Sequence, residues 1–143
     1  MFITLEKHVL QFIKPAKTSR GEYLEKPAYL LWLTHEKFKV CGEASPLSDL
    51  SLDGKINFFD ILAPYEHENL QISDLLNLLE EWKSFPTLRF ALFSALEKAK
   101  TQLQKLHSSN TTSEPNVWVD NAFTMSNVGM KINGLVWMND IDS

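Results

Sequence analysis

Residues 28–44 read AYLLWLTHEKFKVCGEA, two runs of strand-forming side chains separated by the polar triplet HEK. The first run, 28–34, is apolar on both of its faces, which is typical of a strand in the middle of a sheet. The second run, 38–44, has the pattern of a half-buried strand. Because so short a link joins antiparallel neighbours, the stretch predicts an antiparallel hairpin with 28–34 as its central strand.

Upstream of this hairpin, residues 2–14 alternate loosely and predict a further strand. The polar step Glu6-Lys7-His8 indicates a bend in that strand. The segment 17–26, KTSRGEYLEK, is polar and contains Gly21, so we expect a connection there. Three sequential strands with short links predict a three-stranded antiparallel meander. The expected faces of the first strand carry Ile3, Leu5 and Val9, and Phe2, Leu10 and Phe12.

Helix signals follow the strand signals. A first helix is predicted by apolar residues at helical spacing, with Ser73 and Asp74 placed to cap or charge its start. A second helix is predicted to begin near Pro86, and a polar loop follows at 107–116. A strand-like run at 131–140 ends the pattern, so the fold class is α+β. The two helical stripes are Ile72, Leu75, Leu76, Leu79 and Trp82, and Leu88, Ala91, Leu92, Ala95, Leu96, Ala99, Leu103 and Leu106.

The composition fits a globular domain with a modest core, since 44% of the 143 residues are hydrophobic and 22% are charged. The formal net charge of −4 gives no electrostatic footprint for nucleic acid or an anionic membrane. One cysteine, Cys41, excludes an intramolecular disulfide and suits a reducing compartment. The densest apolar run is too short to span a bilayer, and polar residues interrupt any signal peptide. We therefore expect a cytoplasmic protein.

Residues 49–60, DLSLDGKINFFD, come close to a calcium-binding EF-hand loop. Asp49, Ser51, Asp53 and Asp60 stand at ligand positions 1, 3, 5 and 12 of that pattern. However, a strand and a proline-marked turn precede the loop where a helix is required, and position 12 lacks the bidentate glutamate. We therefore interpret 49–60 as an acidic loop without a metal, and the dispersed histidines give no paired metal spacing either.

Four segments resemble the o-succinylbenzoate synthases of the enolase superfamily, in order and spacing. GEASPLSDLS at 42–51 resembles their Gly-Glu-x-Ser-Pro-Leu-Pro-Gly-Phe-Ser segment, and KTSRG at 17–21 resembles their first specificity loop. FPTLRFALFSAL at 85–96 is similar to their Pro-Ser-x-x-Phe helix start, and INGLVWM at 132–138 resembles the first barrel strand. The departures are Ser48-Asp49 in place of Pro-Gly, and Thr87 where serine is frequent.

The resemblance implies that 1–131 form a capping domain and 132–143 begin a (β/α) barrel, so we expect a fragment or a truncated product. In this family the acid/base lysines and the carboxylates that hold Mg²⁺ lie on the barrel. We therefore assign no catalytic residue and no metal ligand to this chain, and expect it to be inactive alone. The implied reaction of the whole enzyme is the Mg²⁺-dependent dehydration that forms o-succinylbenzoate in menaquinone biosynthesis.

The resemblance also implies that two loops, 17–23 and 44–53, close over a small-molecule substrate. Arg20 would either pair with a substrate carboxylate or tie its loop to the barrel. Ser19 and its neighbour Thr18 would either donate hydroxyl hydrogen bonds to the substrate or serve as turn residues. The sequence favours the turn role. Leu47 and Leu50 would wall the apolar side of the substrate or pack under their own loop.

Two other functions stay open. The chain is alternatively the cap of a dipeptide epimerase or a muconate-lactonizing relative, because one fold serves several reactions. It is otherwise a non-enzymatic binding module. Without a barrel, the strand at 132–138 is expected to self-associate, to dock elsewhere on the cap or to stay unpaired.

Overall fold

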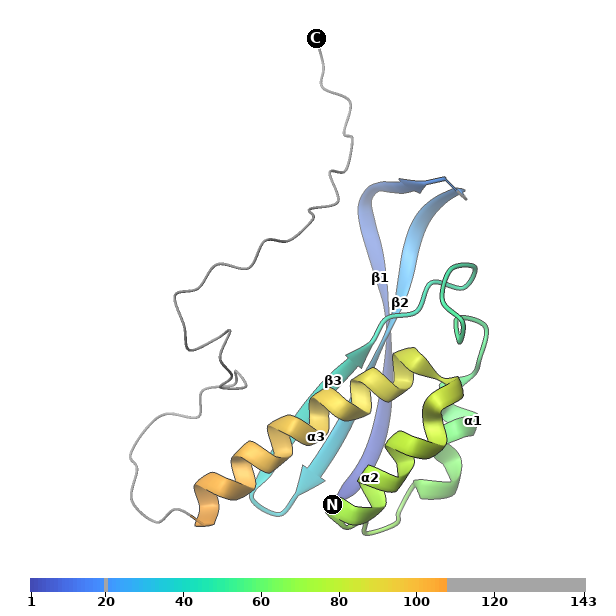
Figure 1. Cartoon of the computed structure of the whole chain (residues 1–143). Coiled ribbons are helices and arrows are strands. Elements are labelled where there is room, and N and C mark those ends of the chain that lie inside the picture. The colour runs from blue at the N-terminus through green and yellow to red at the C-terminus, as the bar shows by residue number, and fades with distance from the viewer. Residues whose placement is uncertain (20, 108–143) are drawn as a thin grey trace, which may run out of the picture.

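The structure, a computed structural model, describes residues 1–19 and 21–107. A three-stranded antiparallel sheet in the order β1-β2-β3 is followed by helices (Figure 1), which confirms the predicted α+β meander. The strand predicted at 132–138 lies outside the described residues, as does the loop predicted at 107–116 except for His107, which ends the last helix. The elements are β1 (Phe2–Thr18), β2 (Gly21–His35), β3 (Phe38–Ala44), α1 (Phe58–Leu62), η1 (Ala63–Tyr65), α2 (Ile72–Glu81), η2 (Trp82–Ser84) and α3 (Pro86–His107).

The β2–β3 hairpin agrees with the sequence prediction. Its register pairs Trp32 with Cys41 and His35 with Phe38, which leaves only residues 36 and 37 in the turn. β2 is the central strand, and its inward-facing Leu31 and Leu33 are fully buried. A strand that has a neighbour on each side and one face covered by helices needs many apolar side chains. This explains why the sequence predicted the central strand correctly.

The prediction of a polar connection at 17–26 was wrong. β1 continues to Thr18 and β2 starts at Gly21, and these two residues pair directly, so the link is two residues long. Gly21 has a φ of 145°, a conformation that other residues rarely adopt. The long hairpin extends beyond the helices (Figure 1), so its side chains face solvent and need not be apolar. The length of the hairpin is therefore set by backbone pairing, which leaves no signal in the pattern of apolar and polar side chains.

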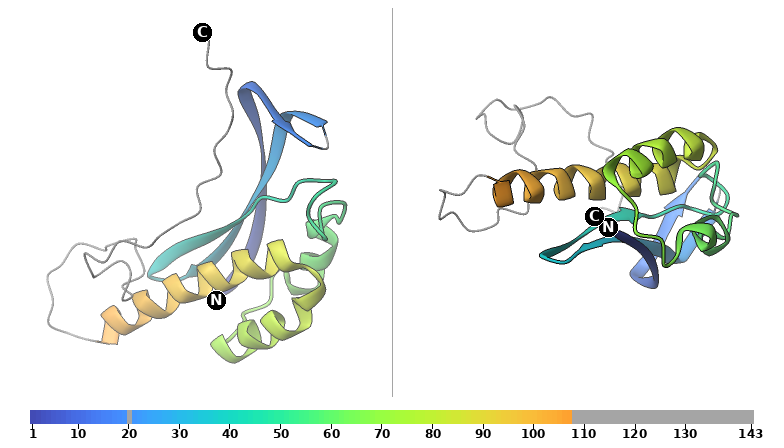
Figure 2. Two further views of the ribbon diagram at one scale, coloured as in Figure 1. Left: turned by 45° about the horizontal axis from the view of Figure 1, so that its top comes forward. Right: turned by 90° about the horizontal axis from the view of Figure 1, so that it is seen from below.

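The sequence predicted a bend in β1 at the polar step 6–8. The structure instead places the irregularity between Gln11 and Ala16. Pairing is continuous from Phe2 to Gln11, which lies opposite Glu25. The next pair is Ala16 with Tyr23, so four residues of β1 face Leu24 alone. Such a bulge disrupts the ladder and bends the strand, and the hairpin turns there in both views (Figures 1 and 2).

The helices cover one face of the sheet and form the core with it (Figure 2). α3 lies so close to β3 that a Cβ on Gly42 would stand 1.9 Å from the carbonyl oxygen of Ala91. The predicted stripe of α3 is buried as far as Ala99, whereas Leu106 in the last turn is 45% exposed. Arg89 Nε donates to the carbonyl of Leu79 at 2.6 Å and so joins α2 to α3.

Two helix starts show how local capping works in this chain. At α2 the backbone N–H of Gln71 donates to the carboxylate of Asp74 at 2.8 Å, in agreement with the predicted role of Asp74 at this end. The short helix α1 was not predicted. The side chain of Asn57 caps it by accepting from the N–H of Phe59 at 3.3 Å, and Phe58 and Leu62 are fully buried.

Candidate functional site

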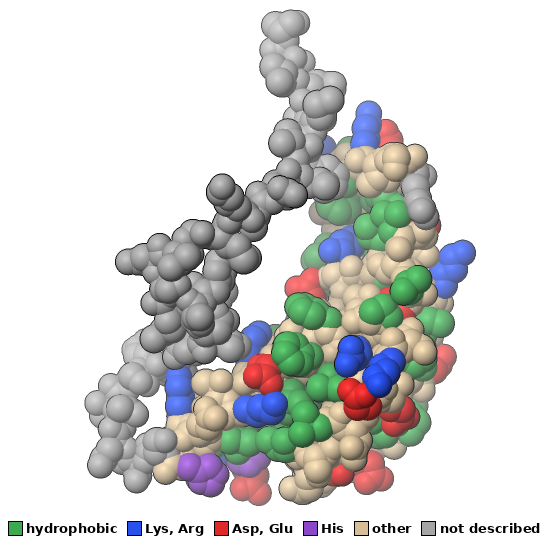
Figure 3. Space-filling view, viewed as in Figure 1, with side chains coloured by type: hydrophobic (Ala, Val, Ile, Leu, Met, Phe, Trp, Pro, Cys, Tyr) green, Lys and Arg blue, Asp and Glu red, His purple; other side chains and the backbone are tan. Residues whose placement is uncertain are grey.

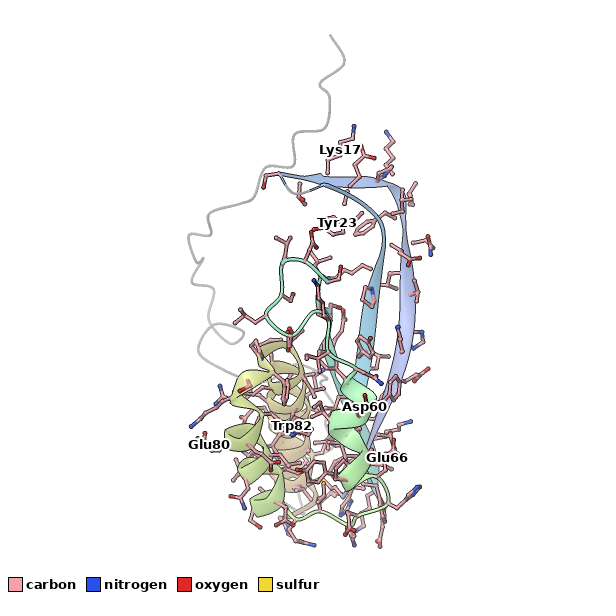
Figure 4. The ribbon with its side chains drawn as sticks, turned by 90° about the vertical axis from the view of Figure 1, so that its right-hand side faces the viewer. Lys17, Tyr23, Asp60, Glu66, Glu80 and Trp82 are labelled. Carbon is pink, nitrogen blue, oxygen red and sulfur yellow. The ribbon has the colours of Figure 1, made fainter. Side chains whose placement is uncertain are left out.

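The two loops expected to enclose a substrate lie side by side at one end of the domain. We call residues 17–23 the hairpin tip and residues 45–57 the post-β3 loop. The hydroxyl of Tyr23 lies 2.6 and 2.7 Å from the two carboxylate oxygens of Asp49 and donates to this carboxylate. Tyr23 points from β2 toward the post-β3 loop (Figure 4). The contact joins residues 26 positions apart in the sequence, and no sequence signal predicted it.

Internal hydrogen bonds hold the first half of the post-β3 loop around Leu47. The N–H of Leu47 donates to Ser51 Oγ at 2.9 Å, and its carbonyl accepts from the N–H of Ser51 at 2.9 Å and of Leu50 at 3.2 Å. Gly54 passes so close that a Cβ there would stand 2.3 Å from the Leu47 carbonyl oxygen. The loop is therefore folded back on itself.

Asp53 anchors the second half of this loop to α3. Its side chain is the buried charged group of the core, with 1% of the residue exposed. One carboxylate oxygen accepts from the N–H of Thr87 at 2.8 Å and of Leu88 at 3.4 Å, and the other accepts from the Thr87 hydroxyl. These N–H groups belong to the first turn of α3 and have no partner within the helix, so Asp53 caps α3 from a distance.

These contacts bear on whether the acidic residues at 49–60 are available to bind a metal ion. Asp49 is bonded to Tyr23, Ser51 to Leu47, and Asp53 to the start of α3. Within residues 1–19 and 21–107, no group of three or more His, Cys, Asp or Glu side chains is arranged to hold a metal ion. The carboxylates of Asp49 and Asp53 therefore already have protein partners, and the described residues form no metal-binding group.

The predicted substrate-binding residues fall in different surroundings. Ser19 is exposed at the turn, and its neighbour Thr18 donates through Oγ1 to the Gly21 carbonyl at 3.2 Å, as a turn residue does. Arg20 lies outside the described residues. Leu47 is half-buried within its own loop, whereas Leu50 is 44% exposed. The structure also brings Leu52, 91% exposed, to this loop, which sequence reasoning missed because an exposed leucine has no periodic signal.

Side chains that looked chemically suggestive in the sequence have structural partners. Ser45 Oγ donates to the carboxylate of Glu43, beside the post-β3 loop. The carbonyl of the half-buried Cys41 accepts from Lys98 Nζ at 2.8 Å. Trp82 is 1% exposed and belongs to the core, as expected. Trp32 is half-buried, donates to Glu6 at 3.1 Å, and has the Lys39 ammonium 4.3 Å from its ring centre.

A groove of about 380 Å³ lies between α2 and the start of α3, apart from the two loops in the chain. Its cations do not make it an anion site, because Lys83 and Arg89 lie 2.5 and 3.7 Å from the carboxylate of Glu80. The space-filling view shows cationic and anionic side chains interspersed over the face in view (Figure 3). The groove is lined by Leu79, Lys83, Pro86, Arg89, Phe90 and Phe93.

Comparison with known proteins gives a similar sequence and a similar fold. No family model matches the chain. A curated o-succinylbenzoate synthase of Desulfotalea psychrophila (strain LSv54 / DSM 12343) is 26% identical over 169 aligned residues, which cover 98% of this chain and 43% of that protein. The chain thus spans less than half the length of this relative. The resemblance indicated by the four segments is confirmed.

The fold is similar to that of a solved dipeptide epimerase from Methylococcus capsulatus, which was crystallised with Mg and the dipeptide L-Arg-D-Lys. The TM-score is 0.52 at 18% identity, and the match covers 71% of this chain and 31% of that chain. At this identity the match shows the fold alone, a three-stranded antiparallel sheet followed by helices. In the described part of the chain, no helix combines the length and apolarity that crossing a membrane requires.

Proposed function

We propose that this chain is the substrate-enclosing cap of an o-succinylbenzoate synthase-like enzyme. In this proposal residues 1–131 form the cap, and 132–143 begin the (β/α) barrel that the relative's additional length would supply. The whole enzyme dehydrates 2-succinyl-6-hydroxy-2,4-cyclohexadiene-1-carboxylate to o-succinylbenzoate, a step of menaquinone biosynthesis in the cytoplasm. Mg²⁺ would be held by carboxylates of the barrel, because the described residues of this chain do not fit it.

The observation that supports this function best is the contact between the hairpin tip and the post-β3 loop. Two loops that are joined through Tyr23 and Asp49 present one continuous rim at the end of the cap. A rim of this kind can close over a barrel mouth, exclude water and contact the distal part of a substrate. The rim is held from the other side by Asp53, which is bonded to the rigid helix α3.

The residues of the rim suit a substrate that has an apolar ring and carboxylates. Leu50 is 44% exposed and would contact the ring, together with Leu52. Leu47, which is half-buried, would support Leu50 from below more than it touches the substrate. Ser19 and Arg20 would face the anionic end of the substrate, where the planar guanidinium of arginine suits a carboxylate. The cap then orients the substrate, while the proton transfers belong to the barrel.

The first test is to read the coding sequence that follows Ser143 in the source genome. A continuing barrel with a Lys-x-Lys strand supports the proposal, and a stop codon supports a free-standing binding module. The second test is to purify the continued protein with Mg²⁺ and follow the dehydration. Arg20→Ala is expected to lower kcat/KM without changing the melting temperature, because surface substitutions usually change the free energy of folding little. Turnover of dipeptides instead of the diene substrate would identify an epimerase.

A further inference from the structure

We propose that Tyr23 and Asp49 are a latch that positions the hairpin tip against the post-β3 loop, so that the two loops move as one body. The proposal deepens the proposed function, since it identifies the pair that sets the shape of the rim over the substrate. Neither residue is a catalytic residue. Both act through the loops that they join.

The geometry of the pair suits a latch. One phenol hydroxyl lies within 2.7 Å of both oxygens of a carboxylate, which gives a short hydrogen bond to an ionised acceptor. Hydrogen bonds of this kind are about twice as strong as those between neutral groups. Tyr23 is half-buried, and its hydroxyl reaches across to the loop.

The hairpin side of the latch lies outside the hydrophobic core. Beyond residue 8, β1 has no buried residue, and Val9, Leu10 and Ile13 are 49%, 50% and 103% exposed. The bulge at 12–15 interrupts the ladder between the sheet and the tip. An exposed hairpin with an interrupted ladder opens at low free energy, so a tie at its far end has a large effect on its position.

The loop side of the latch is rigid by contrast. Asp49 stands between Leu47 and Ser51, which are bonded to each other, and Asp53 fixes the loop to α3 four residues later. The contacts Tyr23–Asp49 and Asp53–Thr87 thus connect the hairpin tip to the helical layer through one loop. The loop is the fixed member of the pair, and the hairpin is the member that the latch holds.

Asp49 is also one of the positions at which this chain departs from the segment it resembles, where Pro-Gly stands in place of Ser48-Asp49. A glycine has no side chain with which to accept from Tyr23. The latch is therefore a property of this sequence and is not implied by the resemblance.

The latch is tested by amide hydrogen exchange with mass spectrometry on the 143-residue chain. Asp49→Ala is expected to raise the exchange rates at residues 16–24 about tenfold or more, as the loss of a hydrogen bond to a charged group predicts. Tyr23→Phe should raise them as well, and the double variant should raise them by less than the two single variants combined. Asp49→Asn keeps an oxygen acceptor but loses the charge, so it should restore about half of the protection, whereas a role of the charge alone would restore none.

The matched control is Tyr65→Phe, because Tyr65 also donates to a carboxylate, that of Glu81, at 2.7 Å but away from the loops. It should leave the exchange of residues 16–24 unchanged. Unchanged exchange there in Asp49→Ala, or an equal rise throughout α3, would overturn the latch. The exchange measurement needs no catalysis. Coupled loops in the 143-residue chain, together with a protein continued beyond Ser143 that has no dehydratase activity, would contradict the proposed function and leave the latch standing.

Discussion

The carboxylate of Asp53 accepts hydrogen bonds from both the backbone N–H and the hydroxyl of Thr87, which lies 34 residues later in the chain. A residue of the loop after the sheet thus caps the helix that packs on the sheet. Because Asp53 is almost completely buried, its carboxylate oxygens rely on these donors for their hydrogen bonds.

Asp53→Ala is expected to lower the free energy of unfolding by about 2 kcal/mol or more, since a buried cap is lost and helix N–H groups are left without an acceptor. Urea denaturation followed by circular dichroism measures this. Asp60→Ala is the matched control, because Asp60 is an exposed residue in the first turn of α1. Equal losses in the two variants would show that the cap contributes nothing specific.

Gly42→Ala should destabilise the domain by roughly 3 kcal/mol, because the new methyl group meets backbone atoms of Ala91 that cannot move without shifting α3. The neighbouring Cys41→Ala, at a half-buried position, is the comparison and should cost much less. Thermal unfolding of both variants checks the difference. A normal melting temperature for Gly42→Ala would mean that α3 can move away from β3 at little cost.

The stability of the domain should fall at high pH through Tyr65. Burial, followed by the hydrogen bond to Glu81 and its charge, raises the pKa of Tyr65 to about 12. The folded state therefore keeps the proton that the unfolded state releases near pH 10, so the contribution of Tyr65 is complete below pH 10 and is lost as the pH rises toward 12. Denaturation at several pH values should show a smaller loss in Tyr65→Phe. The same loss in both proteins would assign it to other groups.

Titration calorimetry of the chain with Mg²⁺ and Ca²⁺ should show no stoichiometric binding at micromolar concentrations. The reason is that Asp49, Ser51 and Asp53 already bind protein donors, and a metal would have to break these contacts. Saturable heat that disappears in Asp49→Ala would contradict this and restore the calcium interpretation of residues 49–60.

Self-association through 132–138 stays a prediction from the sequence, because these residues lie outside the described part of the chain. Each large apolar side chain left in water forgoes about 1.5–3 kcal/mol of burial, which favours pairing between chains. Deletion of 131–143 should therefore reduce self-association in sedimentation experiments without unfolding the sheet and helices. A monomer at full length that is destabilised by the deletion would place this segment in the core of the domain.

The sequence alone determined the helices and strands that have one face in the core and the other in water. β3 was predicted with the bounds that it has, and α2 and α3 were predicted to within a few residues, because burial of one face imposes a period that can be read locally. The extension of the β1–β2 hairpin into residues 17–26 was missed, because Lys17 and Glu22 pair through their backbones while both side chains face solvent. The five-residue helix α1 was missed because it is too short to show a period.

Only the tertiary structure decided what the loops do. The sequence marked 17–23 and 44–53 as the segments of interest, but it did not indicate that Tyr23 meets Asp49 or that Asp53 reaches Thr87. Each of these contacts joins side chains more than two dozen residues apart, and a polar side chain in an acidic loop looks the same in a sequence whether it binds a metal, caps a helix or faces water. Its partner is chosen by the packing of α3 on the sheet, which brings the donors to it.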